Sequence, residues 1–180
     1  EDLSEYEFVS VDLETTSLNT REAKIVGVSL CSNEKRAYYV PVGHVVGENC
    51  PNAMIHLGPF LSDPSIAKVG QNLKYDRKVL LHNGYDLCGI FGDSMLRDYV
   101  RNVEQKHNLD RLSLRYLKHT CISYDEATKS VGGQFALLSP EQALKYAAED
   151  AHVAFLLQEA IVLPSKVKTM YEDIEVPLIS

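Results

Sequence analysis

Four acidic residues occupy positions where a purely structural sequence would place other side chains. Asp12 and Glu14 close an apolar, strand-like run, and Asp76 and Asp150 each fall on the apolar side of a helical pattern. An inward-facing carboxylate is unfavourable unless a positive charge meets it. We expect no matching inward cation in this sequence, so a bound metal ion is the natural counter-charge. Together with Tyr146, the four acids predict a phosphodiesterase site that works with two metal ions.

Asp12 and Glu14 stand two residues apart, so they project from one face of a strand, with Val9, Val11 and Leu13 on the other. Two carboxylates on one face repel each other unless a cation bridges them. Oxygen ligands select hard ions such as Mg²⁺ or Mn²⁺. The alternative interpretation is an exposed strand end that leads into a turn.

Asp150 belongs to a helical pattern over residues 140–162, and Tyr146 precedes it by one turn on the same face. Without a site, Asp150 would bond to a neighbouring loop and Tyr146 would be a half-buried aromatic residue. The pattern divides into a polar sector (Glu141, Gln142, Lys145, Glu149, His152 and Glu159) and an apolar sector that surrounds Asp150 (Ala143, Leu144, Ala147, Ala151, Val153, Ala154 and Leu157).

Asp76 repeats this anomaly in a helical pattern over residues 73–83. Leu73, Val79 and Leu80 bracket it on the apolar side. The alternative is a salt bridge with a neighbouring basic residue, but Arg77 and Lys78 point away around the helix.

The spacing of hydrophobic residues along the chain predicts the strands and helices that must position these residues. Short runs rich in Val, Ile and Tyr predict strands at residues 8–13, 25–31, 37–42 and 66–69. Helical patterns predict helices at residues 52–61, 73–83, 94–103, 110–118 and 140–162. This order predicts an α/β fold with a mixed sheet flanked by helices.

The composition is that of one globular domain over residues 1–180, with 45% hydrophobic and 24% charged residues. The start at Glu1 without a Met suggests a piece of a longer chain, and no stretch has the length and apolarity of a membrane span. The four cysteines show no CxxC pair and no histidine in a zinc-like pattern, so we expect reduced thiols in the cytoplasm. The net charge of −7 implies weak binding of nucleic acid over a short footprint.

Three segments resemble, in order and spacing, the exonuclease motifs of bacterial family A DNA polymerases. They are FVSVDLETTSLN at residues 8–19, GQNLKYDR at residues 70–77 and YAAED at residues 146–150. The resemblance implies an RNase H-like fold of the DEDD class. Tyr146 lies four positions before Asp150, which is the mark of the tyrosine variant. Residues 174–180 resemble the start of the link to a polymerase domain.

The resemblance implies a 3′→5′ exonuclease that removes 5′-mononucleotides from the 3′ end of single-stranded or frayed DNA, as in proofreading. Asp12, Glu14, Asp76 and Asp150 would hold two divalent ions, Mg²⁺ or Mn²⁺, roughly 3.5–4 Å apart. Tyr146 and Glu14 would orient the attacking water. The partners would be DNA 3′ ends and a polymerase domain of the same parent chain, and we expect a monomer.

The resemblance also implies four contacts with the bound strand. An apolar side chain, Leu18, would lie beside the terminal base, Tyr124 would stack on the terminal nucleotide, and Gln71 and Asn72 would contact the strand. For Asp93 we expect an N-cap role, and for the six histidines surface positions. Two other functions stay open: an exoribonuclease of the RNase D type, and a catalytically silent domain that braces a polymerase.

Overall fold

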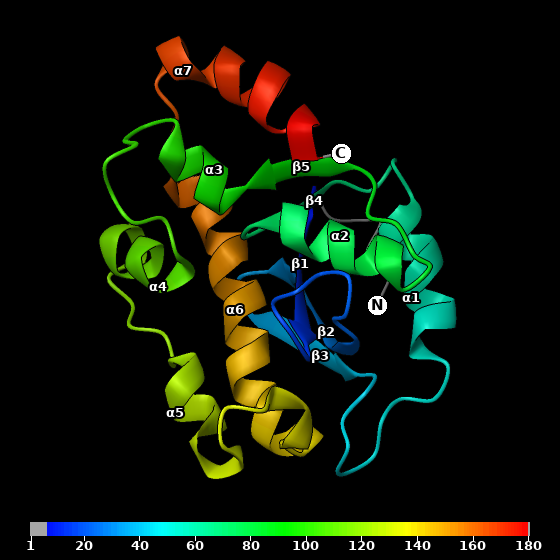
Figure 1. Cartoon of the computed structure of the whole chain (residues 1–180). Helices are drawn as coiled ribbons and strands as arrows, with labels where there is room; N and C mark the ends of the chain where they lie inside the picture. Colours follow the sequence, from blue (N-terminus) through cyan, green and yellow to red (C-terminus); the bar gives the residue numbers. More distant parts are fainter. Residues whose placement is uncertain (1–6, 180) are drawn as a thin grey trace.

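Five strands form one mixed sheet in the computed structural model, which describes residues 7–179 (Figure 1). The strand order is β3-β2-β1-β4-β5. The first three strands pair antiparallel, whereas β4 is parallel to both β1 and β5. The strands are β1 (Val9–Thr15), β2 (Ile25–Asn33), β3 (Arg36–Pro41), β4 (Lys68–Gly70) and β5 (Ile90–Asp93).

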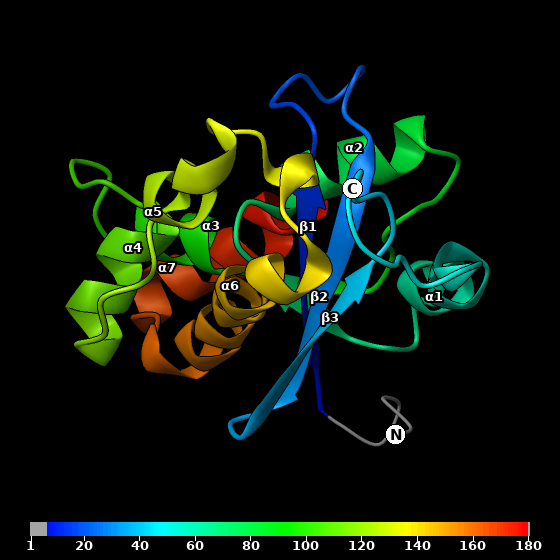
Figure 2. The ribbon, with the colours of Figure 1, turned by 90° about the horizontal axis from the view of Figure 1, so that it is seen from below.

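Helices cover both faces of the sheet. Helices α1 and α2 lie on one face, and α6 crosses the other with the smaller helices α3, α4, α5 and α7 beside it (Figure 2). The α-helices are α1 (Ala53–Ser62), α2 (Leu73–His82), α3 (Ser94–Tyr99), α4 (Leu109–Leu112), α5 (Tyr124–Thr128), α6 (Pro140–Ala160) and α7 (Ser165–Met170). This architecture confirms the predicted mixed α/β fold.

Strand β1 is central, and its alternation sets the position of the acids. Val9, Val11 and Leu13 are buried in the core with residues of α1 and α2. Asp12 and Glu14 therefore project to the opposite face, toward α6, because successive side chains of a strand point to opposite sides. The parity predicted from the sequence is confirmed.

Helix α6 starts at a complete capping box. The Ser139 hydroxyl accepts the backbone N–H of Gln142, and the Gln142 side chain accepts the backbone N–H of Ser139. Pro140 stands in the first turn, where it has no hydrogen bond to lose. One assignment on this helix was wrong: Leu144, placed in the apolar sector, is exposed, because it lines an open cavity between α6, Ala37 and Leu117.

Helix α3 ends four residues earlier than residue 103, where the pattern predicted its end. The side chain of Asn102 accepts the backbone N–H of Glu104. Such a local bond offers the backbone an alternative to the helix. The predicted helix at residues 110–118 begins at Leu109 and widens into a π-helical turn, η2 (Ser113–Leu117).

Two buried polar groups bear on the expectations from the sequence: Lys68 leaves the expectation about the acids unchanged, whereas the surface position expected for His44 was wrong. Lys68 is an inward cation: it is fully buried, its ammonium donates to the carbonyl of Asp63, and the ring of Phe60 lies under it. It faces these groups and therefore does not neutralise the acids of β1. His44 is buried rather than on the surface, because Tyr39 and the carbonyl of Leu138 bond both of its ring nitrogens.

The chain ends in the turns η5 (Tyr171–Glu175) and η6 (Pro177–Ile179), and Ile179 packs into the main core. Residues 1–6 and 180 lie outside the described part, so only 174–179 of the expected link to a polymerase domain can be placed. Among residues 7–179, no helix is both long and apolar enough to cross a membrane.

Candidate active site

Of the five residues predicted for catalysis, three have carboxylates that lie close together. One oxygen each of Asp12, Glu14 and Asp150 lie within 4.8 Å of one another. Asp12 and Glu14 come from β1, and Asp150 comes from the middle of α6, which packs across that strand. The site therefore forms where the carboxyl end of β1 meets α6, the edge at which α/β sheets bind ligands.

Burial and mutual repulsion make these carboxylates reluctant to ionise. Burial raises the pKa of Asp12 to about 6, and burial with the nearby charge of Asp12 raises the pKa of Asp150 to about 8. Burial, followed by the charges of Asp12, Asp150 and Asp76, raises the pKa of Glu14 well above its usual value. The site lacks positive charge among the described residues.

One oxygen of this cluster tests whether the residues fit a metal ion. Oε1 of Glu14 is buried and has no hydrogen-bond partner among the described residues. A buried acceptor without a partner is costly. A divalent cation would satisfy this oxygen and relieve the repulsion at the same time, so the donor set fits a hard metal ion.

Asp76 completes the acidic group from α2. It is buried between Leu73 and Val79, as the helical pattern predicted. Burial, and then the charge of Asp12, raises the pKa of Asp76 well above its usual value. Its neighbour Arg77 pairs instead with Asp86, at 3.1 Å. Among the described residues, Asp76 thus has no ion pair with Arg77 or Lys78, which was the alternative interpretation.

Tyr146 lies one turn before Asp150 on α6, close enough for the charge of that carboxylate to act on its phenol. Burial raises the pKa of Tyr146 far above its usual value, and the charges of Asp150 and Glu14 add to the effect. The phenol is therefore neutral at physiological pH and acts as a hydrogen-bond donor or acceptor, not as a base.

Tyr75 fixes the loop that follows β1, a role that we did not foresee from the sequence. Its hydroxyl donates to the carbonyl of Ser17 at 2.6 Å and lies 2.6 Å from Oγ1 of Thr15. This contact holds the loop against α2. Leu18, the next residue of the loop, is 91% exposed. A large apolar side chain so held in solvent is available for a ligand.

Tyr124 stands across from Tyr146 at the start of α5. The two rings meet edge to face with centroids 6.1 Å apart, and Tyr124 stacks on Phe135 at 6.3 Å. Its hydroxyl donates to the carbonyl of Gly133, which fixes the ring while leaving much of it exposed. The structure thus places Tyr124 beside the predicted catalytic tyrosine.

Gln71 and Asn72 lie between β4 and α2, and their side chains differ in whether they are hydrogen bonded within the protein. The amide of Gln71 is engaged within the protein: it donates to the carbonyl of His107 at 2.7 Å and accepts from the hydroxyl of Ser94. Asn72 is exposed, has φ of 60°, and makes no capping bond through its side chain. Of the two, Asn72 has the side chain that is available to a ligand.

Asp93 has the N-cap role that we expected. Its Oδ1 accepts the backbone N–H groups of Met95 and Leu96 at the start of α3. Its Oδ2 also accepts the backbone N–H of Leu73 at 2.7 Å. One buried carboxylate therefore ties the starts of two helices together, and the second of these, α2, carries Asp76.

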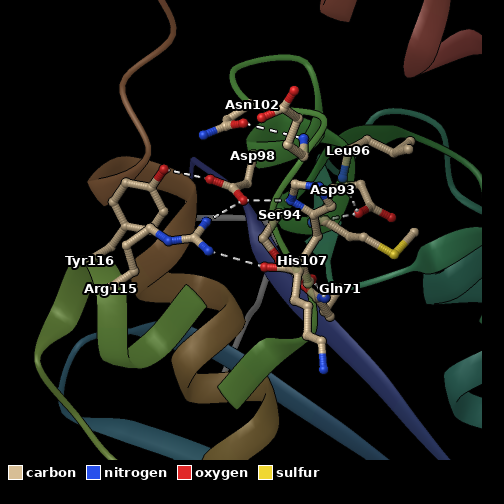
Figure 3. Close-up of polar contacts among 12 residues, drawn as sticks. Gln71, Asp93, Ser94, Leu96, Asp98, Asn102, His107, Arg115 and Tyr116 are labelled. Carbon is tan, nitrogen blue, oxygen red and sulfur yellow. Dashed lines mark hydrogen bonds and ion pairs between the residues drawn. The ribbon is translucent and has the colours of Figure 1, made fainter. Parts of the chain in front are cut away.

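A second buried acid, Asp98, organises the neighbouring loop (Figure 3). Its carboxylate accepts from Arg115 and His107, each at 2.6 Å, and from the hydroxyl of Tyr116 at 2.5 Å. These bonds outweigh burial and lower the pKa of Asp98, which is therefore ionised. We did not predict this network from the sequence, because its members lie on three separate segments.

A groove of about 920 Å³ runs along this network. Its lining is mostly apolar, and it opens toward solvent between α3 and the segment that leads to Tyr124. Lys106, Arg111 and His107 contribute positive or polar groups to the lining, whereas Asp110 is close enough to Asp150 to raise the pKa of that residue. The lining includes Met95, Leu96, Tyr99, Asn108, Leu114 and Ser123.

Sequence comparison places this chain in a known family. The profile of the 3′-5′ exonuclease family associated with A-type DNA polymerases matches residues 1–163. DNA polymerase I of Pseudomonas aeruginosa is 36% identical to this chain, and that of Borreliella burgdorferi is 32% identical. Each of the two alignments covers 98% of this chain. The chain spans about a fifth of the length of these relatives, at 21% and 20%.

Solved structures share the fold at lower identity. A structure titled as the POL domain of Pol1 from M. smegmatis has a TM-score of 0.77 at 18% identity, covering 98% of this chain and 28% of that one. NrnC of Brucella melitensis with bound Mg²⁺ has a TM-score of 0.74 at 22% identity, covering 99% of this chain and 84% of that one. RNase D of Escherichia coli has a TM-score of 0.71 at 16% identity, covering 98% and 45%. The fold is therefore RNase H-like, and the chain belongs to the metal-dependent 3′-5′ exonuclease family of DNA polymerase I.

Proposed function

We propose that this domain removes 5′-mononucleotides one at a time from the 3′ end of single-stranded or frayed DNA, with two divalent metal ions, Mg²⁺ or Mn²⁺. The observation that carries the proposal is the cluster of Asp12, Glu14 and Asp150, with its unpartnered buried oxygen on Glu14. A site with so much negative charge, and with no cation from residues 7–179 to offset it, is suited to bind metal ions first and phosphate afterwards.

Asp12, Glu14 and Asp150 would hold one ion, and Asp12 with Asp76 would support the second. When bound, the ions supply an acidified water and stabilise negative charge on the departing 3′ oxygen. The protein itself positions the ligands: β1 and α6 hold one oxygen of each of three carboxylates within 4.8 Å of one another. Their raised pKa values mean that protons compete with the ions for the same oxygens.

Tyr146 would place the attacking water. Its phenol stays neutral beside Asp150, so it can fix the orientation of a water molecule without removing the proton of that molecule. Glu14 would accept a hydrogen bond from the same water through the oxygen that is not committed to an ion. The scissile phosphate would then lie between the carboxylates and the hydroxyl of Tyr146.

The DNA strand would reach this point along the groove beside α3. Tyr124 would stack on the terminal base and Leu18 would press on it from the other side, because both side chains are exposed at the edge of the site. Asn72 would bond to the strand. Gln71 would act mainly through His107, whose backbone it already holds. Lys106 and Arg111 would meet phosphates farther from the end.

The homologues carry a polymerase domain in the same chain. We propose the same arrangement here: a proofreading domain that acts as a monomeric unit of a cytoplasmic polymerase. The net charge of −7 leaves little affinity for long DNA, so the polymerase domain would supply most of it.

The test is digestion of matched 5′-labelled DNA and RNA strands of one sequence with Mg²⁺ and with EDTA. The proposal expects stepwise shortening of the DNA, release of 5′-mononucleotides, and at least tenfold slower digestion of the RNA. Faster digestion of the RNA would favour the RNase D interpretation. No digestion of either strand with Mg²⁺ or Mn²⁺ would favour a silent bracing domain.

A further inference from the structure

We propose a second metal site, for a thiophilic divalent ion such as Zn²⁺, formed by His119, Cys121 and Glu149. One ligand atom of each of these residues lies within 4.8 Å of the other two. His119 and Cys121 belong to the segment between η2 and α5, and Glu149 belongs to α6. From the sequence we had expected Cys121 to be an ordinary reduced thiol without a zinc-like pattern.

The ligand chemistry separates this site from the cluster of Asp12, Glu14 and Asp150. Mg²⁺ and Mn²⁺ select oxygen ligands, whereas a set of one imidazole, one thiol and one carboxylate suits Zn²⁺ or Co²⁺. Glu149 and Asp150 are neighbours in sequence, but a helix turns by about 100° per residue. Their carboxylates therefore enter different groups of ligands.

The ligands are already held in place by the surrounding backbone. Oε2 of Glu149 accepts the backbone N–H of Ile122 at 2.6 Å, and the hydroxyl of Ser113 donates to the carbonyl of His119 at 3.0 Å. Such outer bonds fix the orientation of metal ligands. They join the 118–123 segment to α6 on one side and to η2 on the other.

An ordinary hydrogen bond explains only part of this arrangement. His119 Nε2 lies 2.8 Å from Oε1 of Glu149, which is a sufficient structural pair by itself. It does not account for the third ligand, Cys121, which lies beside both. Burial, with the charges of Glu149, Asp150 and Asp110, raises the pKa of Cys121 to about 11, and these same negative charges attract a cation.

An ion can reach the site from solvent. The side chain of His119 is 48% exposed, and a cavity of about 710 Å³ on the outer side of α6 is lined by His119, Glu149, Lys145 and His152. On binding, the ion would replace the proton of the Cys121 thiol, which passes to solvent. It would also replace the hydrogen bond between His119 and Glu149, and the neutral imidazole would then carry its proton on Nδ1, which leaves Nε2 free to bind the ion. Water would fill the fourth position, since the protein offers three ligands here.

The test is titration of the 180-residue chain with Co²⁺, a spectroscopic substitute for Zn²⁺, in the presence of excess Mg²⁺. A charge-transfer band between sulfur and Co²⁺ reports a thiolate ligand, which the carboxylate cluster cannot provide. We expect this band to saturate at one equivalent, to vanish when Zn²⁺ is added, and to be absent in Cys121→Ser. His119→Gln should weaken Zn²⁺ binding by at least tenfold.

Cys50→Ser is the control, because Cys50 is also a free thiol, more exposed than Cys121, but belongs to no group of metal ligands among residues 7–179. It should keep the band. Absence of the band in the wild type, its persistence in Cys121→Ser, or its loss in Cys50→Ser would overturn the proposal. Circular dichroism of each variant excludes misfolding. The readout is independent of nuclease activity, so the failure of this proposal and of the proposed exonuclease function are distinguishable.

Discussion

The carboxylate of Asp93 accepts the backbone N–H of Leu73 at 2.7 Å, across 20 residues of sequence. Leu73 is the first residue of α2, and the same carboxylate caps α3 through Met95 and Leu96. The Tyr171 hydroxyl in turn accepts the backbone N–H of Asp93. Asp93 is thus a fixed point between two helix starts, and α2 carries Asp76 into the acidic site.

Replacement of Asp93 should therefore disturb both stability and catalysis. Asp93→Ala removes the acceptor of three backbone N–H groups, and we expect a loss of about 2–4 kcal/mol in the free energy of unfolding. Urea unfolding measures this loss. Nuclease activity should fall as well, because α2 loses its anchor. Asp173→Ala, at an exposed acid on η5, is the control and should change neither quantity.

Asp98 should be needed to keep the shape of the groove that binds the DNA strand, and not for the hydrolysis step. Asp98→Asn keeps the shape of the side chain but leaves Arg115 without its buried ionic partner, at a cost of about 3 kcal/mol. His107 would lose its anchor too, and it lines the groove. We expect KM for a DNA strand to rise with little change in kcat. An unchanged KM together with a fallen kcat would contradict this role.

The sequence was sufficient where a short-range rule decides the outcome. Strand parity placed Asp12 and Glu14 on one face, and helix periodicity placed Asp76 inside α2 and Asp150 on the side of α6 that meets these acids. Both rules depend only on neighbours within a few positions. They also gave the order of the main elements.

The sequence was insufficient where partners come from separate segments. Asp98 meets Arg115 and His107 only after the loop at residues 101–108 folds back, and no periodicity encodes that return. His44 is buried because the carbonyl of Leu138 arrives from 94 residues away. The strand β5 was not predicted, since it has four residues and is specified by its pairing with β4.

The acidic site should make the metal-free protein less stable as the pH rises. Folding raises the pKa of Asp12 from 3.8 to about 6 and that of Asp150 from 3.8 to about 8. The folded state then binds more protons than the unfolded state between pH 4 and 8, so the free energy of unfolding falls across this window. In EDTA we expect a fall on the order of a few kcal/mol.

Thermal unfolding in EDTA at several pH values measures this fall, and Mg²⁺ should reverse it at pH 8. Asp150→Asn should flatten the profile because one of the raised groups is gone. The lowered pKa of Asp98 acts in the opposite sense and only in more acidic solution, as the pH falls through the pKa of that group. A melting temperature that rises between pH 5 and 8 in EDTA would contradict the raised pKa values of these buried carboxylates.

Tyr124 should contribute to substrate binding through its ring. Tyr124→Ala removes the stacking surface and should raise KM for single-stranded DNA about tenfold, within the ~1–3 kcal/mol per stacked base seen for aromatic platforms. Tyr124→Phe keeps the ring and loses only the bond to the carbonyl of Gly133, so its KM should stay within about twofold of the wild type. Steady-state kinetics on one oligonucleotide separates the two variants.

The most direct test of the account is the rate at which Asp12→Ala releases mononucleotides from the 3′ end of a single strand with saturating Mg²⁺. Asp12 lies in the carboxylate cluster, so its loss should lower the rate by about 10³-fold or more while the circular dichroism spectrum is retained. Asp173→Ala should digest at the wild-type rate. A wild-type rate in the folded Asp12→Ala protein would contradict the account.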